Sequence, residues 1–332
     1  MTERCFVTGA NGRIGIHLVR ALADSGHVVV GLARSKTKAA AVRDAGASDC
    51  IVGHMHDVAC LERGLEGANV IYHLAGGLRG PGQETPDVVN REPADNLVAA
   101  IKARTPPLRS VLFTSTCAVY GDREDRWVDE DQAVGPNTRY GQSKVDAEQI
   151  FLAEHRRFDL PVKIARVAAV YGKDFPFLMV EQIRAGKAKL PGEGADSVPL
   201  IHVDDCVRAL RLIADQGADG SIYNVGDQSD TTYEKFYAEV ARLVGGTSPL
   251  FWSDFVPAHL QLFLAKQYER VTSRTGRSPR LTPDMLKLFT NSLRMRSDRL
   301  ESELGFNWRH PTYADGLAEM FGAPQSEHPR AL

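Results

Sequence analysis

The sequence predicts an α/β fold built on a doubly wound parallel sheet, and two observations carry that prediction. Short runs rich in β-branched residues alternate with stretches of helical periodicity in the first half of the chain, as in βαβ units. The runs are mostly continuously apolar, as expected where helices cover both faces of the sheet. The predicted strands are Cys5–Thr8, His27–Ala33, Asp49–Val52, Val70–Leu74, Ser110–Ser115 and Val162–Val167. The predicted helices are Gly12–Ser25, Thr37–Ala45, Cys60–Leu65, Pro93–Arg104 and Tyr140–Arg157.

The second half of the chain is organised differently. After about Gly172 the alternation loosens and connections rich in glycine and proline follow. The chain returns to the first domain at Leu200–Ala214 and Ile222–Val225, so we expect a discontinuous boundary. The expected organisation is a first domain of residues 1–171 and 199–226, a smaller substrate-binding region of residues 172–198 and 227–324, and a frayed tail of residues 325–332.

Composition excludes several classes of partner. The formal net charge of −2 lacks the basic footprint that nucleic-acid binding needs, and no apolar stretch reaches the ~20 residues of a membrane span. The N-terminus has no signal-peptide pattern. Five scattered cysteines contain no Cys-x-x-Cys pair, which favours reduced thiols over a disulfide or zinc framework. We therefore expect a cytoplasmic protein without a metal site.

A glycine-rich loop connects the first predicted strand to the first predicted helix. Its sequence is Thr8-Gly9-Ala10-Asn11-Gly12-Arg13-Ile14-Gly15. Glycine permits close approach of a ligand, and a helix N-terminus offers free N–H groups to a pyrophosphate. A tight turn without a ligand is the alternative, but strand, loop and helix agree in order. The loop predicts a dinucleotide site.

Two nearby positions bear on which dinucleotide binds. The second strand ends in Ala33-Arg34, without the acidic residue that usually holds the ribose 2′-hydroxyl of NAD. Arg34 places a fixed positive charge where a 2′-phosphate would lie, which favours NADP over NAD, although a solvated surface arginine is the alternative. Asp57 could accept the adenine amino group, and it is an equally good loop or cap residue.

A candidate reaction centre follows from spacing on the last predicted helix. Tyr140 and Lys144 stand at i and i+4, on one helical face. Because a nearby cation favours the phenolate, a tyrosine with an ordinary pKa of about 10 can become a proton shuttle. Upstream, Thr114-Ser115-Thr116 closes the fifth strand, at the edge where parallel sheets bind ligands. A hydroxyl there could bind a substrate oxygen.

Together these residues resemble the extended short-chain dehydrogenase/reductases, also called the NAD-dependent epimerase/dehydratase family. The resemblance covers most of the chain. Besides the glycine loop and Tyr140-x-x-x-Lys144, the matching motifs are His73-Leu74-Ala75, Asn90, Thr114-Ser115-Thr116-Cys117-Ala118-Val119-Tyr120-Gly121, Arg166-x-x-x-Val170-Tyr171-Gly172, His202-Val203-Asp204-Asp205 and Tyr223-Asn224-Val225-Gly226.

The resemblance implies a Rossmann-type domain and roles for individual residues. Tyr140 would be the general acid/base, Lys144 would orient the nicotinamide ribose and lower the tyrosine's pKa, and Thr116 would polarise the substrate oxygen, with Ser115 as a substitute. It also implies a homodimer formed through Pro93–Arg104 and Tyr140–Arg157. The implied cofactor contacts are Gly9, Asn11, Gly12, Arg13, Ile14, Gly15, Arg34, Asp57, Val58, Leu74, Ala75, Gly76, Thr114, Tyr140 and Lys144.

Metal binding is not expected at either histidine motif. His202-Val203-Asp204-Asp205 matches a family motif of structural role, and His54-x-His56 has no nearby third ligand in the sequence.

Departures from the family pattern bear on the substrate. Cys117-Ala118 replaces the Asp-Glu pair of the dehydratases, and neither side chain can serve as the acid or base of water elimination. Ala169 and Val198 replace the Asn and Arg that lie near the diphosphate in nucleotide-sugar epimerases. Lys173 or Lys189 could replace the missing Arg as a cation near a diphosphate. Otherwise the pattern resembles that of the hydroxysteroid dehydrogenases, dihydroflavonol-type reductases and carbonyl reductases, with a substrate pocket around Thr116, Cys117, Ala169 and Val198.

Three functions remain after this comparison. The leading one is an NADP(H)-preferring oxidoreductase that interconverts a ketone or aldehyde and an alcohol on an apolar or non-nucleotide substrate, one without a nucleotide diphosphate. The second is a sugar or nucleotide-sugar epimerase with tightly bound NAD, and the third is a catalytically silent protein that senses the dinucleotide. The apolar stretch Phe251–Leu264 could line the substrate pocket of the first, or pack as an ordinary helix or dimer face.

Overall fold

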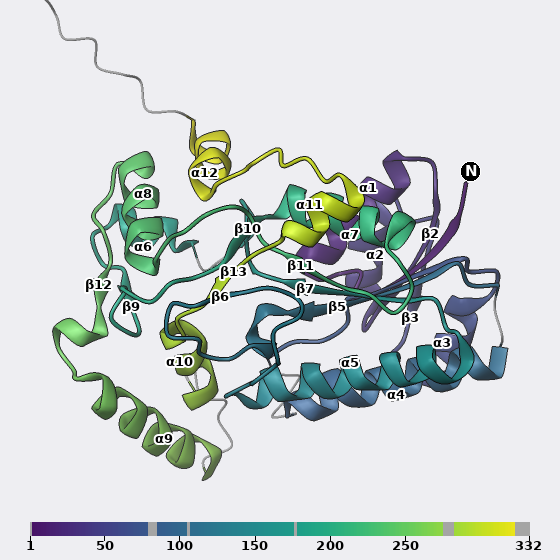
Figure 1. The fold of residues 1–332 in the computed structure, drawn as a ribbon, viewed down its shortest axis with the longest axis horizontal. Helices are drawn as coiled ribbons and strands as arrows, with labels where there is room; N and C mark the ends of the chain where they lie inside the picture. The colour runs from purple at the N-terminus through teal and green to yellow at the C-terminus, as the bar shows by residue number, and fades with distance from the viewer. Residues whose placement is uncertain (1, 79–84, 105–106, 176–177, 275–281, 323–332) are drawn as a thin grey trace, which may run out of the picture.

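One seven-stranded parallel sheet forms the centre of the protein (Figure 1). The computed structural model describes residues 2–78, 85–104, 107–175, 178–274 and 282–322. The strand order is β11-β7-β5-β4-β1-β2-β3, with every neighbouring pair parallel. The strands are β1 (Arg4–Thr8), β2 (Val28–Ala33), β3 (Asp49–Val52), β4 (Val70–His73), β5 (Ser110–Thr116), β7 (Val162–Val167) and β11 (Ile222–Val225). The predicted doubly wound α/β fold is confirmed.

Helices cover both faces of the sheet, which explains why its strands are apolar throughout. The first face carries α1 (Arg13–Asp24), α2 (Lys36–Asp44), α7 (Val203–Gln216) and α11 (Asp298–Leu304). The opposite face carries α3 (Val58–Leu65), α4 (Pro86–Arg104) and α5 (Arg139–Phe158). Each layer encloses its own hydrophobic core against the sheet.

Helix α4 differs from the prediction at its start. We expected a helix from Pro93, since proline is favoured in the first turn, but the helix begins at Pro86 and passes through Pro93. Proline inside a helix removes one backbone hydrogen bond. The helix continues because packing outweighs that loss: Pro93 itself is buried, and so are Ala94, Leu97 and Ile101 against the sheet.

A second region lies beyond the carboxyl end of the sheet and has its own core. It contains short parallel strand pairs and further helices, some of which contribute apolar residues to this core. The strand pairs are β8 (Ala169–Tyr171) with β10 (Leu200–His202) and β9 (Lys189–Leu190) with β12 (Leu250–Phe251). The helices are α6 (Val180–Arg184), α8 (Tyr233–Val244), α9 (Ala258–Arg274), α10 (Pro283–Thr290) and α12 (Tyr313–Phe321).

The chain crosses between the two regions more often than the predicted boundaries suggest. β13 (Arg294–Met295) pairs with β6 (Trp127–Val128), and α11 packs on α7 and β11. Residues near 293–306, predicted as part of the substrate-binding region, therefore complete the core of the first domain. The predicted tail, 325–332, lies outside the described residues. Within the part described, no helix is both long and apolar enough to cross a membrane.

Candidate active site

The glycine loop is shaped by backbone contacts that exclude larger side chains. Gly9 has φ +68°, and a Cβ there would lie 2.7 Å from the backbone nitrogen of Ala75. A Cβ at Gly15 would lie 2.2 Å from the Gly9 carbonyl oxygen. Gly12 is the N-cap of α1 and provides no side-chain cap, so the first N–H groups of the helix stay available. The loop is thus a cradle for an anion at a helix N-terminus.

A cavity of about 180 Å³ extends from this loop along the carboxyl edge of the sheet. It brings together residues that are distant in the sequence. The predicted cofactor residues that line it are Gly9, Asn11, Gly12, Arg34, Leu74, Ala75 and Gly76. Residues that the sequence analysis did not assign to the cofactor also line it, namely Leu32, Gly53, His54, Met55, His56, Val88, Val89 and Pro93.

The turn after β3 faces the cavity with a different pair of residues from those predicted. Asp57 is the N-cap of α3, and its carboxylate accepts from the Cys60 backbone N–H at 3.2 Å and the Cys60 thiol at 3.0 Å. Val58 begins the helix and is exposed. His54 and His56 line the cavity instead, with stacked rings whose centroids are 4.9 Å apart. Asp57 therefore caps α3, and its predicted contact with the adenine amino group stays a prediction.

Tyr140 stands at the start of α5, next to the hydroxyl that ends β5. Burial raises the pKa of the Tyr140 phenol to about 12, and the nearby Thr116 hydroxyl has a smaller effect that lowers it. Lys144 is not among the groups that shift it, so the predicted lowering by that cation is not seen. Burial also raises the pKa of the neighbouring Cys117 thiol to about 11. Both side chains are therefore protonated at neutral pH.

Lys144 is buried one turn further along α5. Its Nζ donates to the Thr114 carbonyl oxygen at 2.8 Å and lies 4.5 Å from the Phe113 ring centroid. Burial lowers the pKa of Lys144 to about 8, and the Glu148 carboxylate opposes that shift. A Cβ at Gly76 would lie 3.3 Å from Nζ, so the ammonium reaches the rim of the dinucleotide cavity.

Ser115 faces away from this pair of hydroxyls, into a buried polar network. Its Oγ donates to Glu148 Oε1 at 2.5 Å, and Glu148 forms two bonds with the Arg166 guanidinium, at 2.8 and 3.1 Å. Arg166 also donates to the Tyr120 hydroxyl, which donates to Asn224 at 2.8 Å. The Ser115 hydroxyl is thus occupied by Glu148, whereas the Thr116 hydroxyl accepts from the Ala118 backbone N–H at 3.3 Å and lies near the Tyr140 phenol.

Asn90 connects α4 to the same site. Its Nδ2 donates to the carbonyl oxygens of Gly77 and Pro86 and to Ser143 Oγ, and its Oδ1 accepts from the Gly77 N–H at 3.0 Å. These bonds fix the loop after β4 against α5. The family motif at Asn90 thus positions the cavity wall that carries Gly76.

The predicted substrate-pocket residues occupy different environments. Val198 is buried in the core of the second region, and Ala169 is partly buried beside it on β8. Two residues outside the predicted set, Tyr233 and Asp196, belong to the second region. Burial raises the pKa of the Tyr233 phenol, with smaller effects in the same direction from Tyr237, Cys117 and Asp196, and the hydroxyl donates to the Leu288 carbonyl oxygen at 3.1 Å. Burial and three neighbouring carboxylates, Glu193, Asp122 and Asp125, raise the pKa of Asp196 to about 6.

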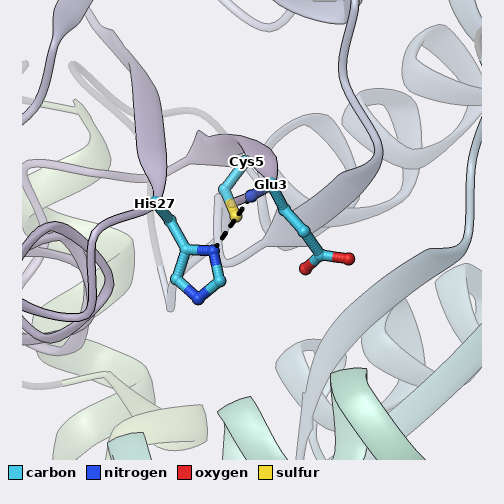
Figure 2. A group of neighbouring side chains, drawn as sticks. All are labelled: Glu3, Cys5 and His27. Carbon is cyan, nitrogen blue, oxygen red and sulfur yellow. Dashed lines mark hydrogen bonds between the residues drawn. The ribbon is translucent and has the colours of Figure 1, made fainter. Parts of the chain in front are cut away.

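The histidine and acidic motifs have structural partners. His202 is the N-cap of α7. Asp205 accepts from the backbone N–H groups of Arg309 and His310 and from Arg208. A separate group, Glu3, Cys5 and His27, is spaced for a metal ion (Figure 2). Glu3, however, forms a two-point ion pair with Arg109, and burial raises the pKa of the Cys5 thiol to about 12.

The residues around the crevice fit a dinucleotide. The loop is a cradle that side chains would fill, and the buried Thr114 Oγ1 has no hydrogen-bond partner among the described residues. The fold and crevice therefore define a nucleotide-binding domain of Rossmann type, and Tyr140, Lys144 and Thr116 form its candidate reaction centre.

Comparison with known proteins narrows this class. Residues 5–226 match the model of the NAD dependent epimerase/dehydratase family, and the chain belongs to that family. The UDP-glucose 4-epimerase of Mycolicibacterium smegmatis is 30% identical over 73% of this chain and 83% of its own length. The 4-hydroxy-2-methyl-3-oxo-4-farnesyl-3,4-dihydroquinoline-1-oxide ketoreductase of Stigmatella aurantiaca is 26% identical over 98% of this chain and 99% of its own. The dTDP-glucose 4,6-dehydratase DesIV of Streptomyces venezuelae, solved with NAD and TYD, has a similar fold, with a TM-score of 0.76, 23% identity and coverage of 96% and 95% of the two chains.

Proposed function

We propose that this protein is an NADP(H)-preferring carbonyl reductase that acts on an apolar ketone or aldehyde without a nucleotide diphosphate. The observation that carries the proposal is that the Thr116 hydroxyl is close enough to the Tyr140 phenol to lower its pKa, while Cys117 and Ala118 follow Thr116 where the dehydratases carry an acid and a base. Two hydroxyls suffice to bind and protonate one carbonyl oxygen. Water elimination needs a further acid and base, which a thiol with a pKa of about 11 and Ala118 do not supply.

The protonation state of Tyr140 favours the reductive direction. With its pKa raised to about 12, the phenol is protonated at neutral pH and can donate to a carbonyl oxygen that gains charge. Thr116 holds the same oxygen by a second hydrogen bond, while Lys144 lies at the rim where a nicotinamide ribose would bind. The nicotinamide supplies the hydride when it is bound. Tyr140 then has one task, to give its proton to the product alkoxide.

Charge near the substrate region argues against a diphosphate. Asp196 has three carboxylates close enough to raise its pKa, and both Asp196 and Cys117 are close enough to Tyr233 to raise the pKa of its phenol. A diphosphate placed there would meet like charges instead of the cations that bind phosphate oxygens.

An apolar groove of about 620 Å³ offers room for a hydrocarbon body. Trp252, Phe255, Val256, Leu264 and Tyr268 line it. Arg139, the neighbour of Tyr140, bonds Glu269 of α9 at 3.2 Å and Asp284 of α10 at 3.0 Å. These bonds attach the apolar region to the catalytic helix. The Stigmatella aurantiaca ketoreductase, whose substrate name includes a farnesyl group, aligns over nearly the whole chain and supports the same substrate class.

NADP preference is proposed from Arg34. Its side chain lines the dinucleotide cavity at the end of β2, and no acidic residue follows that strand. A guanidinium binds a phosphate through two parallel hydrogen bonds, so it should discriminate NADPH from NADH.

The test is a kinetic comparison of both cofactors with an apolar ketone panel. Wild-type protein should oxidise NADPH with a lower KM than NADH, and Arg34→Ala should raise the KM for NADPH by about tenfold or more while changing that for NADH little. Arg20→Ala, an exposed arginine of α1, is the matched control and should change neither. Equal effects of Arg34→Ala on both cofactors would refute the 2′-phosphate role.

The second candidate function is a sugar or nucleotide-sugar epimerase, favoured by the 30% identity to the mycobacterial UDP-glucose 4-epimerase. An epimerase returns the hydride to the same substrate and keeps its NAD. Denaturing the purified protein and measuring the released dinucleotide separates the two functions. One NAD per chain without NADPH turnover supports the epimerase and contradicts the reductase.

A further inference from the structure

A second cavity lies at the opposite edge of the sheet from the dinucleotide crevice. Its volume is about 960 Å³. Three of its lining residues stand immediately before strands: Glu3 before β1, His27 before β2 and Arg109 before β5. The cavity thus faces the amino ends of the strands, whereas the glycine loop and Thr116 lie at the carboxyl ends. A ligand here would not compete with the cofactor.

Tyr72 of β4 is the first sign that the cavity is built for a ligand. Its side chain lines the cavity and is 4% exposed, yet its hydroxyl has no hydrogen bond to any residue that the structure describes. The hydroxyl itself is not fully buried and faces the cavity, where an acceptor on a ligand could replace water as its partner. Burial raises the pKa of Tyr72, so the hydroxyl stays protonated and can donate a hydrogen bond to a ligand.

Arg211 of α7 supplies a positive charge beside this donor. The two other arginines that line the cavity are neutralised: Arg109 pairs with Glu3 at 2.5 Å and Asp215 at 3.3 Å, and Arg208 pairs with Asp205 at 2.6 Å. Arg211 bonds only the neutral Ser25 hydroxyl, at 2.7 Å, and no carboxylate of the described residues lies within ion-pair distance of it. Its positive charge is close enough to the Tyr72 phenol to lower the pKa of that group, against the larger effect of burial.

His27 adds a third donor at the rim. Its Nδ1 accepts the Glu3 backbone N–H at 3.3 Å, so the neutral ring carries its hydrogen on Nε2 (Figure 2). That bond occupies Nδ1, the ring nitrogen drawn near the Cys5 sulfur, and Arg109 holds the Glu3 carboxylate. The arrangement therefore suits an incoming acceptor better than a metal ion.

We propose that this cavity binds a small organic carboxylate with an apolar body. The carboxylate would accept from Arg211, Tyr72 and His27, which together match the lone pairs of one such group. Leu22, Leu212, Leu304 and Phe306 line the remainder of the cavity and would pack against the hydrocarbon part. This site is independent of the proposed reaction, and failure of either leaves the other standing.

Isothermal titration of the full chain with phenylacetate tests the proposal, with acetate, inorganic phosphate and Zn²⁺ as further probes. Phenylacetate should bind with a Kd on the order of 1 mM or below, and more tightly than acetate or phosphate. Arg211→Gln and Tyr72→Phe should each weaken it by about tenfold or more, since each removes a hydrogen bond to a charged group. Arg20→Gln should leave the Kd unchanged, and saturating NADPH should not displace the probe.

Several outcomes would overturn the proposal. The proposal fails if phenylacetate does not bind at roughly 10 mM, if it still binds the Arg211→Gln variant as it binds wild type, or if NADPH displaces it. Equal affinity for inorganic phosphate would reassign the cavity to phosphate. Tight Zn²⁺ binding that Cys5→Ser abolishes would replace the carboxylate site by a metal site. Circular dichroism of each variant distinguishes loss of binding from loss of fold.

Discussion

Glu148 provides the sharpest test of how the fold supports the reaction centre. Its side chain is 1% exposed and makes two bonds to Arg166, which is 5% exposed, and one to Ser115. Glu148→Gln keeps the shape and removes the charge. Breaking a buried ion pair from one side leaves the other charge uncompensated and costs about 3–5 kcal/mol. We expect a loss of that size in the free energy of unfolding.

The same substitution should change the pH dependence of activity. The Glu148 carboxylate favours the Lys144 ammonium, whose pKa is about 8. Without that negative charge the pKa falls further, so the ammonium is lost at lower pH. The alkaline limb of kcat/KM, which reports the free enzyme, should therefore begin at lower pH in Glu148→Gln than in wild type.

Urea unfolding and a pH–rate profile measure these two effects. The matched control is Glu239→Gln, which breaks a largely exposed pair with Arg242 and should cost about 1 kcal/mol or less without moving the pH profile. The reasoning is refuted if Glu148→Gln destabilises the protein no more than this control does, or if the alkaline limb stays in place.

Three further predictions concern other parts of the protein. Tyr140→Phe should lower kcat by about 100-fold or more with intact cofactor binding; unchanged kcat in steady-state assays would exclude the phenol as proton donor. Burial raises the pKa of Asp227 to about 7, so the folded protein holds a proton that the unfolded chain releases from pH ~4 upward, and stability falls through that window. The free energy of unfolding of Asp227→Asn, measured in urea relative to wild type, should therefore rise by about 2–4 kcal/mol from pH 5 to pH 8. An equal difference from wild type at both pH values would contradict this. The chain should form a homodimer through α4 and α5, and light scattering after size exclusion should give twice the mass of one chain; a monomer would count against it.

The fold could be predicted because its signals are local. Each predicted strand of the first half is present, since continuous apolar runs buried under helices leave a clear trace in the sequence. The start of α4 could not be predicted, because the burial of Ala94 and Leu97 outweighs the preference of proline for a first turn. The return of residues near 293–306 to the first core depends on contacts between distant segments, which periodicity does not encode.

The site could be predicted in part. The glycine loop, Thr116, Tyr140 and Lys144 follow from fixed spacing at the ends of predicted elements. Glu148 could have been found the same way, since it continues the i, i+4 face of Lys144. Tyr233 and Asp196 carry no such signal, because only the folded second region brings Tyr233 close enough to Asp196 and Cys117 for their charges to affect its pKa.

The most direct test of the central claim is transfer of deuterium from NADPH labelled at nicotinamide C4. The protein would be incubated with both C4-deuterated diastereomers of NADPH and an apolar ketone panel, and the alcohols analysed by mass spectrometry. One diastereomer should deliver one deuterium per alcohol, and Tyr140→Phe should slow formation of the labelled alcohol by about 100-fold or more. Recovery of every ketone unreduced with both diastereomers, together with one NAD released per chain on denaturation, would contradict the carbonyl reductase proposal.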